Sequence, residues 1–76
     1  MKAIGVDCTF AVDGTVQVRR IAVDGAWEAV EQGRQWLDEA GRHVLVMRGG
    51  VAVREIVLQR DGLAWGLKKQ QGPQVV

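Results

Sequence analysis

The sequence predicts an α+β domain with the element order ββαβββ, in which an antiparallel sheet of about five strands carries one amphipathic helix on one face. Three observations lead to this prediction. Apolar and polar residues alternate before residue 24, and short apolar or alternating runs follow residue 42, both of which are typical of strands. Between them, residues 26–40 separate into an apolar and a polar side when placed on a helix. Asp-Gly and Gly-Gly pairs, which favour tight turns, separate these segments.

The first 23 residues are predicted to form a β-hairpin. The apolar residues that alternate along it are Ile4, Val6, Cys8, Phe10 and Val12, followed by Val16, Val18, Ile21 and Val23. Asp13-Gly14 lies between the two runs and suits a type I′ turn, in which both central residues have positive φ. The alternation slips by one position at Arg19-Arg20, which predicts a β-bulge there.

Residues 25–40 are predicted to form the helix. Asp24 is a suitable N-cap residue, because its carboxylate can accept a hydrogen bond from a free N–H of the first turn. Gly41 is a suitable residue to end the helix. Gly33 falls on the apolar side, where it would let the helix approach the sheet closely. A strand over 26–37 is the competing interpretation, but neither its odd-numbered nor its even-numbered residues form an apolar face.

The remaining strands are predicted over residues 43–47, 51–59 and 63–67, with turns at Gly49-Gly50 and Asp61-Gly62. Residues 1–69 are therefore expected to form a single α+β domain. The segment 70–76 shows no apolar period and contains Gly72-Pro73, so we expect it to be a flexible C-terminal tail.

The predicted strands after the helix carry apolar residues on both faces, whereas one helix can cover only one. An apolar face left uncovered is typical of an interface. Because a chain of 76 residues buries only a small core, we expect a homo-oligomer, in its simplest form a two-fold dimer. The alternative is an all-β small barrel, whose curled sheet would bury both sets. The candidate self-association residues are Val44, Val46, Val53, Ile56 and Leu58.

Charge is distributed unevenly along the chain. Residues 24–41 contain five acidic residues and one basic residue, a net charge of −4, whereas the rest contain nine basic and four acidic residues, a net charge of +5. A basic sheet and turn surface would suit a nucleic-acid backbone, although the total charge of +1 is low for such modules. The candidate contacts for nucleic acid are Arg19, Arg20, Arg48, Arg54, Arg60, Lys68 and Lys69.

No motif for catalysis, a metal or a cofactor is present. The one cysteine and one histidine exclude an intrachain disulfide and a Cys/His zinc site. Cys8 and His43 would be the one nucleophile–base pair, but Cys8 belongs to an alternating apolar face and no third group orients the pair. We expect His43 to pack in the fold or to meet the last carbonyls of the helix.

The three tryptophans could stack on nucleic-acid bases, but such residues more often pack in the fold. We expect Trp27 and Trp36 to lie at the boundary of the apolar helix face and Trp65 to be buried. No apolar run reaches the length of roughly 18–20 residues that a bilayer requires. The lone thiol and the lack of a signal-peptide pattern predict a cytoplasmic protein. The sequence thus predicts a non-enzymatic module that acts through protein–protein contacts, with nucleic-acid binding as the alternative.

Overall fold

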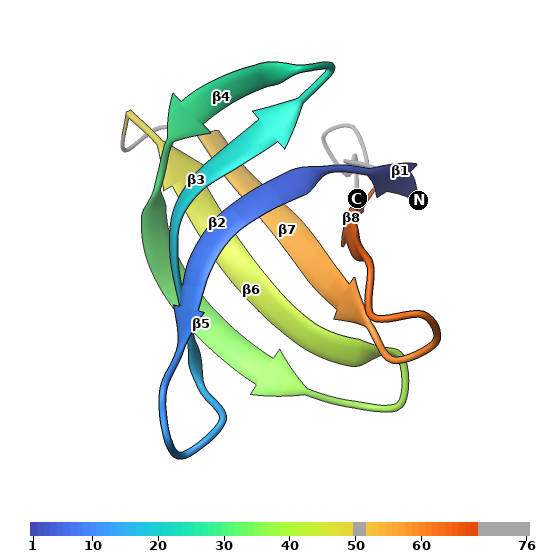
Figure 1. Cartoon of the computed structure of the whole chain (residues 1–76). Helices are drawn as coiled ribbons and strands as arrows, with labels where there is room; N and C mark the ends of the chain where they lie inside the picture. The colour runs from blue at the N-terminus through green and yellow to red at the C-terminus, as the bar shows by residue number, and fades with distance from the viewer. Residues whose placement is uncertain (50–51, 69–76) are drawn as a thin grey trace, which may run out of the picture.

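The computed structural model describes residues 1–49 and 52–68, which form eight strands and no helix. The α+β prediction, with its helix over residues 25–40, is therefore wrong. Two antiparallel sheets pack face to face, one with the strand order β1-β8-β7-β6-β5 and the other with the order β2-β3-β4 (Figure 1). The all-β alternative matches this composition, but the sheets do not close into a barrel. The strands are β1 (Lys2–Ala3), β2 (Gly5–Phe10), β3 (Val16–Val23), β4 (Ala26–Ala29), β5 (Glu31–Leu37), β6 (Gly41–Arg48), β7 (Ala52–Gln59) and β8 (Trp65–Leu67).

The predicted start of the helix is a two-residue hairpin turn. Asp24 and Gly25 both have positive φ, 53° and 80°, as a type I′ turn requires. Val23 pairs directly with Ala26 across this turn, so the chain returns as β4 beside β3. Asp24 therefore caps no helix. An Asp-Gly pair is a strong signal for a hairpin. Asp24-Gly25 is therefore the local feature of the sequence that favours a strand, rather than a helix, after residue 25.

Residues 26–37 form two strands whose side chains change phase twice. β4 belongs to the three-stranded sheet and β5 to the five-stranded sheet, with Val30 between them. Within β5, a bulge between Gln32 and Gln35 breaks the alternation again. Such changes place apolar residues at irregular spacings along the chain, and these spacings resemble a helical repeat.

The other predicted strands are present, with corrections at the turns. The bulge is confirmed, because Asp7 pairs with Arg20 and Cys8 with Val18, which leaves Arg19 as the extra residue. At Asp13-Gly14 only the glycine has positive φ, so the type I′ prediction is wrong there. After β7 the positive φ values fall on Gly62 and Leu63 rather than on Asp61 and Gly62. Gly50, Val51, Lys69 and the predicted tail over residues 70–76 lie outside the described residues.

The core lies between the two sheets and consists mainly of aliphatic side chains. Its buried members come from β3, β6, β7 and β8, which are residues Val16, Val18, Ile21, Val44, Val46, Ile56 and Leu67. Cys8, Val30 and Trp65 are partly buried and pack against this cluster. The chain passes from one sheet to the other at two corners, between β1 and β2 and between β4 and β5, as in sandwiches whose strands switch sheets at bends.

Two glutamine side chains join β5 to β3 where no strand ladder connects the sheets. Gln32 Oε1 accepts a hydrogen bond from the Val18 N–H at 2.6 Å, and Gln32 Nε2 donates to the Val16 carbonyl at 2.9 Å. Gln35 accepts from the Val16 N–H at 3.0 Å and also donates to the Val16 carbonyl at 2.9 Å. Both amides therefore satisfy backbone groups of β3 that the ladder leaves unpaired.

Replacement of Gln32 by alanine is expected to lower the free energy of unfolding by about 1–3 kcal/mol, the cost of leaving a buried N–H without a partner. Gln17→Ala is the matched control, because Gln17 is an exposed glutamine on β3. Urea denaturation followed by circular dichroism measures both variants. Equal stabilities of the two variants would show that the Gln32 amide does not hold the sheets together.

Candidate interaction site

The predicted self-association residues lie on different sides of the five-stranded sheet. Val44, Val46 and Ile56 are buried in the core between the sheets, each with an exposed fraction of 1% or less. They therefore cannot contact another chain in the folded state. Leu58 is half-buried and lines a groove with Leu37. Val53 is the one residue of this set that lies on the opposite side of the sheet, where 49% of it is exposed.

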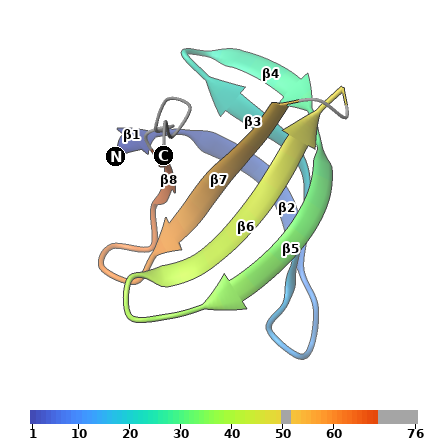
Figure 2. The same ribbon diagram turned by 180° about the vertical axis from the view of Figure 1, so that it is seen from behind.

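The side of the five-stranded sheet that faces away from the core is called here the outer face. Its central residues follow from the strand register, in which Leu45 pairs with Glu55 and Met47 with both Glu31 and Val53. Leu45 and Met47 are half-buried although no described strand passes over them (Figure 2). Together with Trp36 on β5, the residues Leu45, Met47 and Val53 form an apolar strip on this face. Glu31 and Glu55 lie beside the strip.

Gly33 lies on the outer face rather than beneath a helix. A Cβ atom built on Gly33 would lie 3.6 Å from the Leu45 Cβ and 3.7 Å from the Met47 Cε, which are ordinary contacts. The prediction that Gly33 permits a close approach between a helix and the sheet is therefore wrong. Its missing side chain instead leaves one flank of Leu45 and Met47 open.

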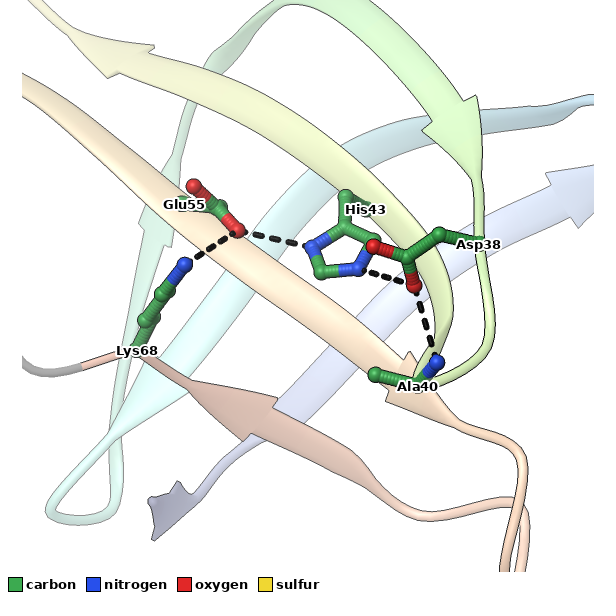
Figure 3. A network of polar contacts seen from close by, with 5 residues as sticks. All are labelled: Asp38, Ala40, His43, Glu55 and Lys68. Carbon is green, nitrogen blue, oxygen red and sulfur yellow. Dashed lines mark hydrogen bonds and ion pairs between the residues drawn. The ribbon is translucent and has the colours of Figure 1, made fainter.

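His43 lies at one end of this strip and is held between two carboxylates (Figure 3). Its Nδ1 is 2.7 Å from Glu55 Oε2, and its Nε2 is 2.7 Å from Asp38 Oδ1. The Lys68 ammonium is 3.3 Å from Glu55 Oε2, and the Ala40 N–H donates to Asp38 Oδ1. We call Asp38, His43 and Glu55 the histidine clamp. The expected contact of His43 with helix carbonyls is wrong, because residues 25–40 form no helix.

The clamp favours the imidazolium form of His43. Burial of the ring lowers the pKa of His43, but the hydrogen bonds and charges of Glu55 and Asp38 outweigh burial and raise the pKa above 6.5. The hydrogen bond from His43 lowers the pKa of Asp38 in turn. When both ring nitrogens donate to carboxylates, neither has a lone pair free to act as a base or to bind a metal. The clamp is thus suited to fix the turn between β5 and β6 against β7.

The clamp is expected to make stability depend on pH. Since the pKa of His43 is raised on folding, its contribution is complete below about pH 6.5 and is lost as the pH rises through the folded pKa. The free energy of unfolding should therefore fall as the pH rises above about 6.5. In the His43→Gln variant the fall should be absent. Urea denaturation at several pH values measures both proteins, and an equal fall in the variant would assign the effect to other groups.

The three tryptophans lie on three different surfaces, so they do not form one stacking platform. Trp36 stacks on His43 with 5.1 Å between ring centroids and 3° between ring planes, and the Arg34 guanidinium carbon lies 5.2 Å from the Trp36 ring centroid. Trp27 lies on the three-stranded sheet, half exposed, with Arg20 against its ring. Trp65 is half-buried and packs against the core, so it is less buried than expected.

The basic residues proposed for nucleic-acid contact do not gather on one surface. Arg19 and Arg20 lie on the three-stranded sheet and both bind Asp7. Arg48 and Arg54 line a cavity at the end of the two sheets, Arg60 follows β7, and Lys68 follows β8. Arg48 and Lys68 are paired with Glu28 and Glu55. Lys69 lies outside the described residues.

The structure separates the two residues of the conceivable nucleophile–base pair. Cys8 packs against the core between the sheets, and burial raises the pKa of its thiol. His43 belongs to the other side of the five-stranded sheet, with both nitrogens occupied. Within residues 1–49 and 52–68, no group of three His, Cys, Asp or Glu side chains is arranged to hold a metal ion. The same residues include no helix long and apolar enough to cross a membrane.

Of the outer face, Val53 alone was among the residues predicted for self-association, and the histidine clamp was not predicted. Leu45 and Met47 alternate with Val44 and Val46, so the strand pattern showed two apolar faces without showing which was inward. A turn placed at residues 38–41 would have set Trp36 opposite His43, as observed. No known family model, curated protein or solved structure matches the chain, so the site rests on its own geometry.

Proposed function

We propose that this protein is a non-enzymatic interaction module that pairs with a second copy of itself through the outer face. The observation that carries the proposal is the apolar strip of Trp36, Leu45, Met47 and Val53, which no described strand covers. Charged groups beside an apolar centre are the usual arrangement of an interface. The lone thiol of Cys8 favours a reducing compartment such as the cytoplasm.

A second copy is a suitable occupant because the charges beside the strip are complementary to themselves. Glu31 and Arg34 are both exposed on β5, and neither forms an ion pair within the described ranges. In a two-fold interface, a residue that contacts another across the axis is matched by the reciprocal contact. Arg34 of each copy can therefore meet Glu31 of the other. Such a pair favours one register of the two strips.

The small core is a second argument for pairing. In the described part of the chain, the buried core consists of aliphatic side chains of moderate size, with isoleucine and leucine the largest. Domains of this length bury a small fraction of their unfolded surface and often gain stability by association. The dispersed basic residues offer no comparable surface for a nucleic acid, so protein contact is the function that the geometry supports better.

Charge reversal tests the two-fold geometry. Arg34→Glu and Glu31→Arg, each alone, are expected to weaken the dimer several-fold, because each would place like charges opposite one another. The double variant carrying both changes restores opposite charges at both contacts and should recover most of the affinity. Sedimentation at a series of concentrations gives the dissociation constants. Additive losses in the double variant would contradict the proposed pairing of Arg34 with Glu31.

A further inference from the structure

A cavity of about 240 Å³ lies between the sheets, away from the outer face. Its lining residues come from the β3–β4 hairpin and the residues that follow it, from the end of β6 and from the beginning of β7, and Figure 1 shows where these strands lie. Its apolar lining comes from Ile21, Val23, Val30 and Val46. The charged groups around it are Asp24, Glu28, Arg48 and Arg54. The cavity thus joins an apolar surface to charged side chains.

Arg54 enters this cavity from the inner side of β7, where it pairs with the core residue Val46. Its Nε is buried and has no hydrogen-bond partner among the residues that the structure describes. A buried donor without a partner costs free energy, and such groups often mark a site that a ligand completes. A leucine or methionine at this position would fill the same space without that cost.

The other charges at the cavity are already neutralised by pairs. Arg48 Nη1 lies 2.8 Å and 2.7 Å from the two carboxylate oxygens of Glu28. Asp24 Oδ1 lies 2.7 Å from the Lys2 ammonium. Arg54 forms no ion pair within residues 1–49 and 52–68. The cavity therefore carries one uncompensated positive charge next to an apolar surface.

We propose that this cavity binds a small organic monocarboxylate with an apolar chain. The Arg54 guanidinium donates to the carboxylate, since its planar donors match that group, and the chain lies against Ile21, Val30 and Val46. One uncompensated charge fits a monoanion better than a phosphate dianion, which the apolar lining would also disfavour. The volume lies below the roughly 300–1,000 Å³ of sites for drug-sized ligands, so the ligand is small. This proposal is independent of pairing through the outer face.

The proposal is tested by titrating the full chain with matched probes and monitoring binding by NMR. Hexanoate is compared with the neutral hexanamide. Because a peptide C-terminus offers the same chemistry, acetyl-Val-Val is compared with its C-terminal amide. At least one of the two acids should bind saturably, and at least about tenfold more tightly than its amide, the loss expected when a charge-assisted hydrogen bond is removed. The acid that binds more tightly shows whether the carboxylate comes from a small organic acid or from a peptide C-terminus.

Arg54→Met is the decisive variant, because it keeps an unbranched side chain as far as the position of the buried Nε and removes the charged guanidinium. It should weaken binding of the preferred acid at least about tenfold and leave the melting temperature equal or higher, because the unpartnered donor is gone. Arg60→Met, in the exposed turn after β7, should leave binding unchanged. Failure of both acids to bind saturably, equal affinity of acid and amide, or unchanged binding by Arg54→Met would each overturn the proposal.

Discussion

Replacement of Gly41 by alanine is expected to abolish the folded state, with a loss of more than about 4 kcal/mol, which is comparable to the roughly 3–5 kcal/mol that a single core supplies below about 80 residues. Gly41 has a φ of 141°, a backbone angle that residues with a side chain rarely adopt. A Cβ atom at this position would also overlap the Leu58 carbonyl oxygen. Gly41 also closes the turn between β5 and β6 through two backbone hydrogen bonds with Asp38. Relief of the overlap would therefore separate β6 from β7 at the edge of the clamp.

The matched control is Gly14→Ala, at another glycine with positive φ but with no atom within 4 Å of an added Cβ. It should cost about 1–2 kcal/mol, the backbone term alone. Circular dichroism and urea denaturation of the two variants separate steric overlap from backbone strain. If Gly41→Ala were as stable as Gly14→Ala, the close pairing of β6 with β7 at Gly41 would be contradicted. A glycine that merely ended a helix would give that mild result.

Leu45→Glu is expected to abolish pairing through the outer face while the monomer stays folded. Leu45 is half-buried at the middle of the strip, next to Glu55 across the strands. A second carboxylate there would lie beside a like charge and would be buried without a partner in the dimer. Such a charge costs at least about 3 kcal/mol, and every 1.4 kcal/mol changes the dissociation constant tenfold. A weakening of about 100-fold or more should follow.

Val12→Glu is the control for Leu45→Glu, because it adds the same charge at a fully exposed valine in the β2–β3 turn. Light scattering gives the mass of each variant, and circular dichroism shows whether each keeps its strands. Unchanged pairing by Leu45→Glu in a folded protein would exclude the outer face as the interface.

The sequence predicted the strands well where a run of strand-forming residues lies between two turn signals. The segments around Val18 and Val44 are of this kind, and the slip in the alternation at Arg19 correctly predicted the bulge. The prediction from the sequence failed over residues 25–40, because β4 and β5 belong to different sheets and β5 carries a bulge of its own. On the helix predicted over residues 25–40, Gln32 and Gln35 fall on the polar side, whereas in the structure both amides reach inward to β3. Long-range partners of this kind leave no local pattern.

The site was mispredicted for a related reason. Alternation along β6 shows that Val44 and Leu45 face opposite ways, but the inward side is set by the sheet that packs on it. The prediction placed a helix where β4 and β5 lie, so it lacked the three-stranded sheet that packs on Val44. Val44 was therefore assigned to the surface. The histidine clamp joins residues from β6, β7 and the β5–β6 turn. It could be found only after the register of these three segments was known.

The mass of the unmodified protein in solution, measured by size exclusion with light scattering over a range of concentrations, tests self-association most directly. Pairing through the outer face predicts that the mass rises from the 8.3 kDa of one chain toward twice that value and then stays constant. A mass that remains at 8.3 kDa throughout the range would contradict it.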